Sequence, residues 1–256
     1  MSRIQKLFET KPRGVLNVYC TAGFPEADST IDVLQSLQAA GADMVEIGMP
    51  YSDPLADGPV IQASGTTALQ KGMTIHRLFE QLKSLRPAID LPVILMGYLN
   101  PVLQFGFEAF CNTAAALGVD GLIIPDLPIL EFEEEYGPII KKCGLDFIFL
   151  ITPETSDERI QKIDELSSGF VYAVSSSSTT GKDKNFNSLE DYFSRLKSLH
   201  LQNPVMVGFG IKDKASFDAV TPYAAGAIIG TAYIKAISNS SDISKTTKEF
   251  IEAIRN

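Results

Sequence analysis

A short apolar run followed by a helical segment recurs along the whole chain, and this repeat limits the fold more than any other feature. Eight such runs show no alternation of polar and apolar residues, which is typical of parallel strands buried on both faces. The runs cover 15–22, 44–49, 93–98, 121–125, 145–151, 169–174, 204–209 and 225–229. Eight strand-helix units in 256 residues predict an α/β fold, a (β/α)8 TIM barrel.

The longest connections indicate where functional loops lie. They follow the second and sixth runs, and strand-to-helix connections of a barrel lie on its catalytic face. At the start of the chain, Ile4, Leu7 and Phe8 share one helical face, which predicts an extra N-terminal helix at the bottom of the barrel. With 45% hydrophobic residues and no visible boundary, we expect 1–256 to form a single domain.

Composition excludes several classes of partner. The net charge is -9 and no basic run is present, which argues against nucleic acid and anionic membranes. No apolar run approaches the ~18 residues of a membrane span, and the first residues lack the apolar core of a leader. Cys20, Cys111 and Cys143 have no CxxC spacing, so we expect neither a disulfide framework nor a zinc site, and a cytoplasmic location.

The second run leads into a loop that carries carboxylates back over a strand end. Glu46 lies inside the apolar run, where burying a carboxylate is costly unless it is paired or used. Three prolines shape the loop that follows, which holds Asp53 and Asp57. Two carboxylates in different surroundings suit an acid/base pair. The alternatives are a buried ion pair for Glu46, a turn-stabilising role for Asp57 and loop capping for Asp53.

Glycines follow the seventh and eighth runs. Gly208-Phe209-Gly210-Ile211 ends the seventh, and Gly230-Thr231-Ala232 precedes a short helical segment, 233–237. Barrels often bind phosphate between these two loops and the start of a short extra helix, so we expect a phosphate site here rather than tight turns alone. The third glycine of a dinucleotide fingerprint is missing.

A serine-rich segment, 175–185, follows the sixth run. Its Gly181-Lys182 pair lacks the upstream glycine of a phosphate-binding P-loop. Composition favours a flexible connector, but the position at a strand end opposite the Glu46 loop favours a mobile lid. Asp126, after the fourth run, is a candidate either for supporting the site residues from behind or for anchoring this lid.

The loop 46–59, read with 17–23, 96–101, 125–128, the serine-rich segment and 208–211, resembles the alpha subunit of tryptophan synthase over nearly the whole chain. The resemblance implies retro-aldol cleavage of indole-3-glycerol phosphate to indole and glyceraldehyde 3-phosphate. It also implies no cofactor or metal in this chain. Indole would pass to a beta subunit that binds pyridoxal phosphate, in an alpha2-beta2 heterotetramer.

The resemblance assigns roles residue by residue. Glu46 matches the general acid/base, Asp57 the partner of the indole nitrogen, and Thr180 the lid threonine that positions Asp57. The substrate would be lined by Tyr172 and Phe209, and its phosphate held by Gly181, Gly210, Gly230 and Thr231. The lid departs from the Ser-Arg-x-Gly-x-Thr-Gly pattern of many members, with Ser176 and Ser178 in place of Arg and Gly.

Other functions lack necessary residues. A Schiff-base aldolase needs a desolvated lysine, and no run contains one, because Lys212 falls just beyond the seventh. A metal-dependent epimerase needs strand-end histidines, whereas His76 falls on a helix and His200 before the seventh run. A binding subunit that only activates a partner remains open, although Glu46 and Asp57 argue against it.

Overall fold

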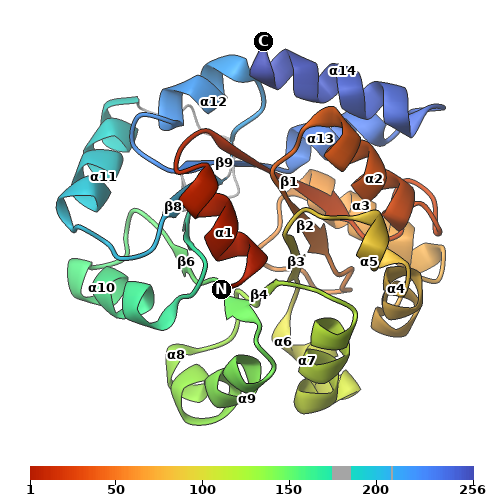
Figure 1. The fold of residues 1–256 in the computed structure, drawn as a ribbon, viewed down its shortest axis with the longest axis horizontal. Coiled ribbons are helices and arrows are strands. Elements are labelled where there is room, and N and C mark those ends of the chain that lie inside the picture. Colours follow the sequence, from red (N-terminus) through yellow and green to blue (C-terminus); the bar gives the residue numbers. More distant parts are fainter. Residues whose placement is uncertain (175–185, 209) are drawn as a thin grey trace.

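The computed structural model describes residues 1–174, 186–208 and 210–256, whose strands form one parallel sheet (Figure 1). The strands are β1 (Val15–Thr21), β2 (Met44–Gly48), β3 (Val93–Met96), β4 (Gly121–Ile123), β5 (Asp146–Phe147), β6 (Leu150–Ile151), β7 (Val171–Val174), β8 (Val205–Gly208) and β9 (Gly226–Ile229). Their order is β5-β4-β3-β2-β1-β9-β8-β7-β6. The eight predicted runs are confirmed as strands, with the fifth divided into β5 and β6.

The divided strand closes the barrel. β5 and β6, the two ends of the order, are consecutive parts of the predicted run 145–151. Beside β5, the Ile148 N–H donates to the Leu122 carbonyl at 3.0 Å, and beside β6 the Tyr172 N–H donates to the Phe149 carbonyl at 3.0 Å. One stretch of chain therefore pairs with β4 in its first half and with β7 in its second. The expected α/β barrel is confirmed.

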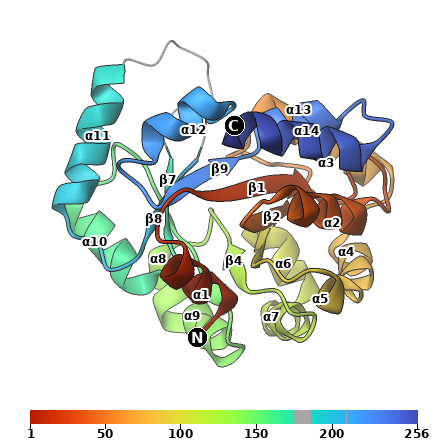
Figure 2. The same ribbon diagram turned by 45° about the horizontal axis from the view of Figure 1, so that its top comes forward.

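Helices surround the sheet on its outer face, except the first, which lies across one end of the barrel (Figures 1 and 2). They are α1 (Arg3–Thr10), α2 (Thr30–Ala40), α3 (Pro59–Gln70), α4 (Ile75–Leu82), α5 (Leu85–Ala88), α6 (Leu99–Phe105), α7 (Phe107–Ala116), α8 (Ile129–Glu131), the π-helix η1 (Phe132–Tyr136), α9 (Gly137–Lys142), α10 (Asp157–Leu166), α11 (Phe186–Ser198), α12 (Lys214–Val220), α13 (Thr231–Ile237) and α14 (Ile243–Arg255). None of these described helices has the length and apolar character needed to cross a bilayer.

Apolar side chains fill both faces of the strands. One cluster lies between strands and helices, and a second contains Met44, Ile94, Phe170 and Met206 from different strands. The second cluster forms the barrel interior because side chains alternate along each strand. It also includes Ile4 and Phe8, so α1 closes the barrel as expected. Ile4 lies against the starts of β4 and β7, which places α1 at the end opposite the strands' carboxyl ends.

Prolines explain most differences from the predicted helices. The expected helix 74–85 ends at Leu82 in α4, and within the short α5 that follows, Arg86 takes extended angles because it precedes Pro87. The sequence prediction missed α6, where Pro101 lies in the first turn and needs no N–H donor. The expected helix 131–143 contains η1, which ends just before Pro138, a residue that cannot donate to the helical ladder.

Candidate active site

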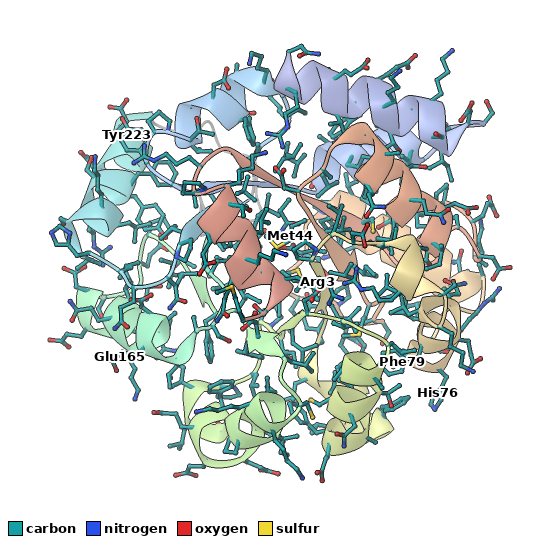
Figure 3. All side chains as sticks on the ribbon, viewed as in Figure 1. Arg3, Met44, His76, Phe79, Glu165 and Tyr223 are labelled. Atoms are coloured by element: carbon teal, nitrogen blue, oxygen red, sulfur yellow. The ribbon has the colours of Figure 1, made fainter. Side chains whose placement is uncertain are left out.

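Glu46 lies on β2 in the barrel interior, with none of its surface exposed. It shares a strand face with Met44, which lies near the centre of the ring of helices in Figure 3. The Asn17 amide nitrogen donates to Glu46 Oε1 at 2.5 Å, while Oε2 has no hydrogen-bond partner among the described residues. Burial raises the Glu46 pKa to about 8, against the opposing effect of the Asn17 bond. Glu46 is therefore protonated at neutral pH and can act as an acid.

Asp57 lies on the loop between β2 and α3. The Tyr98 hydroxyl donates to Asp57 Oδ2 at 3.2 Å and accepts the Ala56 N–H at 3.0 Å. Burial raises the Asp57 pKa to about 6, and the Tyr98 bond opposes this rise. Between these two pKa values Asp57 is ionised while Glu46 keeps its proton, which is the separation that an acid/base pair needs.

The loop that carries Asp57 is tied to its surroundings. The Gln62 side chain donates to the Asp57 carbonyl at 2.8 Å, and the Asp57 N–H donates to the Pro54 carbonyl at 3.1 Å. Asp126 accepts the Leu99 N–H at 2.8 Å and so fixes the start of α6, directly after Tyr98. In the described residues Asp126 therefore supports Tyr98, and its predicted contact with the lid involves residues outside them. Asp53 accepts the Ser52 hydroxyl within its own loop, which agrees with the capping alternative.

Two tyrosines project into the interior from β1 and β7. Tyr19 pairs with Glu46 in register, and Tyr172 pairs with Met206. Each hydroxyl lies over a glycine of the next strand, because a Cβ on Gly48 would overlap the Tyr19 hydroxyl and one on Gly208 the Tyr172 hydroxyl. Burial holds the pKa of both phenols well above its usual value. Both therefore remain neutral, and Tyr172 lies in the interior near the predicted site.

A small cavity opens at the carboxyl ends of the first strands. Its lining residues are Tyr19, Met49, Asp57, Met96, Gly97, Tyr98 and Pro125. Apolar and aromatic walls with one carboxylate suit a flat aromatic ring that presents an N–H group. Its volume is about 10 Å³, room for roughly one water molecule, so the cavity marks where the Asp57 carboxylate meets apolar walls and would have to widen to admit a ring.

Part of the predicted phosphate site can be described. Gly210 follows β8 with a φ of 81°, a conformation that favours glycine, and Gly230 precedes α13. Gly230 has no side-chain cap, so the first N–H groups of α13, which begins at Thr231, receive no bond from it. β8 and β9 are neighbours, which brings the two loops to one rim. Thr180, Gly181 and Phe209 lie outside the described residues.

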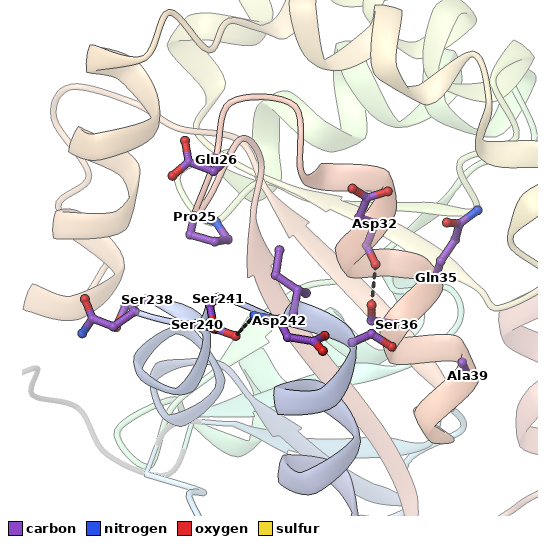
Figure 4. Close-up of a pocket in the computed structure, with 13 residues that line it drawn as sticks. Pro25, Glu26, Asp32, Gln35, Ser36, Ala39, Ser238, Ser240, Ser241 and Asp242 are labelled. Atoms are coloured by element: carbon purple, nitrogen blue, oxygen red, sulfur yellow. Dashed lines mark hydrogen bonds between the residues drawn. The ribbon is translucent and has the colours of Figure 1, made fainter.

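Another surface hollow lies between α2, the loop after β1 and the segment joining α13 to α14 (Figure 4). Ser36 donates to the Asp32 carbonyl at 2.7 Å and the Asp242 N–H to the Ser240 hydroxyl at 3.1 Å, so these polar groups are locally engaged. None of the predicted site residues lines it.

Among the described residues no group of His, Cys, Asp and Glu could hold a metal. His76 lies at the molecule's outer edge (Figure 3).

Sequence reasoning missed Asn17, Tyr19 and Tyr98 as site residues. Asn17 is a polar residue within an apolar strand and fully buried, the same signal that identified Glu46. Tyr98 carried no such signal, because an aromatic residue at a strand end is common in any barrel.

The comparisons with known proteins agree with one another. A model of the family "Tryptophan synthase alpha chain" matches residues 6–256. Proteins of that name from Flavobacterium johnsoniae and Parabacteroides distasonis are 51% and 48% identical to the chain, each with 100% of both chains covered. The structure of tryptophan synthase subunit alpha from Legionella pneumophila gives a TM-score of 0.90 at 33% identity, covering 100% of this chain and 97% of the other. An aminoacrylate-bound tryptophan synthase from M. tuberculosis gives 0.87 at 30% identity, with 100% of both chains covered.

Proposed function

The chain belongs to the tryptophan synthase alpha chain family, and we propose that Glu46 and Asp57 perform its reaction. The family cleaves indole-3-glycerol phosphate to indole and glyceraldehyde 3-phosphate in tryptophan biosynthesis, and the chain is a lyase of this kind. The observation that carries the assignment is the pair of carboxyl groups with separated pKa values, about 8 for Glu46 and about 6 for Asp57.

The reaction breaks the bond between C3 of the indole ring and the glycerol chain. Glu46 gives its proton to C3, and its carboxylate then takes the proton of the neighbouring chain hydroxyl, which becomes the aldehyde. The electron pair of the broken bond returns to the ring, and Glu46 ends the cycle protonated. Asp57 accepts the ring N–H and stabilises the positive charge that protonation places on the ring. Side chains perform both transfers, so the reaction needs no cofactor in this chain.

For the substrate's remaining groups we propose the sites predicted from the sequence. The phosphate would bind backbone N–H groups near Gly181, Gly210 and Gly230 and the Thr231 hydroxyl. The uncapped first turn of α13 and the positive φ of Gly210 support this site. Tyr172 and Phe209 would contact the substrate, and Thr180 would bond Asp57 when the lid is closed.

We propose that the partner is a beta subunit that holds pyridoxal phosphate, in an alpha2-beta2 heterotetramer. Three leucines on the loops and helices that follow β2, β3 and β4 support a docking surface on the catalytic rim. Leu55 is 91% exposed, Leu103 44% and Leu130 61%, and each lies on a connection that follows the carboxyl end of a strand. Indole released from the cavity would leave directly beneath this surface.

We further infer that 1–256 is one domain and that the protein is cytoplasmic. The interior cluster joins α1 to strands from β1 to β9, which supports a single folding unit. The cysteine usage supports a reducing compartment, because Cys20 and Cys111 are buried without a partner sulfur.

Indole release from indole-3-glycerol phosphate tests the assignment. We expect the isolated chain to release indole and both Glu46→Gln and Asp57→Asn to lose this activity. The matched control is Asp53→Asn, which changes a carboxylate of the same loop outside the cavity. A chain that binds a beta subunit and releases no indole would instead be a binding subunit.

A further inference from the structure

Asn17 and Glu46 form a polar pair inside an otherwise apolar barrel interior. Both are fully buried, and their neighbours on the interior face include Val15, Met44 and Ile94. One bond joins them, from Asn17 Nδ2 to Glu46 Oε1 at 2.5 Å. Buried polar atoms are normally hydrogen-bonded, so the remaining atoms of this pair require an explanation.

Two oxygens of the pair have no hydrogen-bond partner among the described residues, Asn17 Oδ1 and Glu46 Oε2. Both are acceptors while Glu46 is ionised, so neither can satisfy the other. One proton on Oε2 changes this, because Oε2–H is a donor and Oδ1 is the acceptor that lacks one. A protonated Glu46 therefore leaves fewer unsatisfied acceptors in the pair than an ionised one.

We propose that Asn17 is a positioning residue that directs the proton of Glu46 to Oε2 and stabilises the carboxylate formed when that proton leaves. The Nδ2–H bond occupies Oε1, so Oε2 is the oxygen that carries the proton and delivers it to the substrate. After the proton moves to C3, the same Nδ2–H bond stabilises the carboxylate that must act as base. The inference rests on the proposed role of Glu46.

The other groups around Glu46 cannot replace Asn17. The titratable neighbours that interact with it are Tyr19 and Cys20 on β1 and Tyr172 on β7. Burial raises the pKa of each above its usual value, so all three are neutral at neutral pH. On β3 the residue in register with Glu46 is Ile94, which is apolar. Burial therefore keeps Glu46 protonated, and within the described residues Asn17 is the side chain whose hydrogen bond favours the ionised form.

The test is the Asn17→Leu variant, which removes donor and acceptor together. Activity falls at alkaline pH as Glu46 loses its proton. Because the Asn17 bond lowers the Glu46 pKa, its loss should move this limb of the kcat profile to higher pH by about one to two pH units. We expect kcat at neutral pH to fall roughly 10-fold, as a part of the ~10²–10⁴ of acid/base catalysis, with KM little changed. Thr247→Val, which removes a buried hydrogen bond of 2.8 Å to Tyr233, is the control and should keep the native profile.

A second measurement does not depend on activity. The infrared C=O band of the protonated carboxyl, identified by its loss in Glu46→Gln, should shift to higher frequency in Asn17→Leu because the acid loses its partners. Asn17→Val serves if the Leu variant does not fold. An unchanged band and an unchanged alkaline limb in a folded variant would overturn the proposal. If Glu46→Gln retains activity while the band still shifts, the assigned role of Glu46 fails and the pairing stands.

Discussion

The Tyr98 hydroxyl holds the Asp57 loop through the Asp57 side chain and the backbone of the preceding residue. It donates to Oδ2 at 3.2 Å and accepts the N–H of Ala56, the preceding residue, at 3.0 Å. Because Asp126 fixes the start of α6, this contact joins the ends of β2, β3 and β4. Within the described residues, these contacts hold the loop so that its carboxylate faces the cavity.

Replacing Tyr98 with phenylalanine should impair Asp57 while leaving Glu46 unchanged. The lost hydrogen bond lowers the Asp57 pKa in the native chain, so its removal raises that pKa above about 6. The acidic limb of the kcat/KM profile should move to higher pH, with kcat/KM falling roughly 10-fold, as expected for a hydrogen bond to a charged group. Tyr51→Phe is the control, because Tyr51 accepts a bond from Asn100 and meets Tyr98 through a tilted ring contact with centroids 5.4 Å apart, which phenylalanine keeps. An unmoved limb in Tyr98→Phe would show that Tyr98 does not position Asp57.

Glu46→Gln should change how stability depends on pH. The Glu46 pKa is raised from 4.5 to about 8 on folding, so the folded state binds its proton more tightly than the unfolded state. Stability should therefore fall as pH rises from about 4.5 to 8, by a few kcal/mol on the order of 1.36 per pKa unit. Urea unfolding across this range should show the variant losing less stability than the native chain. If the stability of the variant and of the native chain depended on pH in the same way, folding would not raise the Glu46 pKa.

Valine at Gly210 or Gly230 should weaken phosphate binding. Gly210 has a positive φ that side chains disfavour, and a Cβ at Gly230 would lie 3.3 Å from the Tyr19 Cβ. We expect KM to rise at least roughly 10-fold, the equivalent of ~1.4 kcal/mol, with kcat less affected. Gly41→Ala controls for backbone strain, because Gly41 has a φ of 93° with open space around it at the end of α2. If the native chain binds indole-3-glycerol and indole-3-glycerol phosphate equally well, the phosphate contributes no affinity and the proposed phosphate site is wrong.

Leu55→Asp should weaken binding of the beta subunit. Leu55 is almost fully exposed, so its replacement leaves folding and the cavity intact. Calorimetric titration with the cognate beta subunit should show a loss of affinity of roughly 10-fold or more if Leu55 is an interface anchor. Tyr223→Asp is the control, because Tyr223 is exposed before β9, on the side away from the catalytic rim. Equal affinities for the two variants would exclude this docking surface.

Much of the fold could be predicted because parallel strands buried on both faces are continuous apolar runs. The split of the fifth run could not, since it depends on which strands lie on either side of 145–151 after folding. Pro87 and Pro101 show that helix bounds are also hard to predict from the sequence. A proline marks an interruption in the sequence, but whether it ends a helix or lies in a first turn depends on the surrounding chain.

Some residues of the candidate site could likewise be predicted from local sequence, and others could not. Glu46 and Asp57 could be recognised locally, from a carboxylate inside an apolar run and a proline-shaped loop. Asn17 and Tyr98 act through partners about 30 to 40 residues away in sequence, at separations of 29 and 41. Register between β1 and β2 brings Asn17 to Glu46, and no local pattern reports such a pairing.

The most direct test of the central claim is single-turnover cleavage of indole-3-glycerol phosphate by Glu46→Gln at saturating substrate. The amide keeps the shape of the side chain and cannot deliver a proton, so substrate affinity should remain close to native. The rate of indole formation should fall by ~10²–10⁴, the usual contribution of acid/base catalysis. Indole formation by the variant at near the native rate would contradict the assignment of Glu46 as the proton donor.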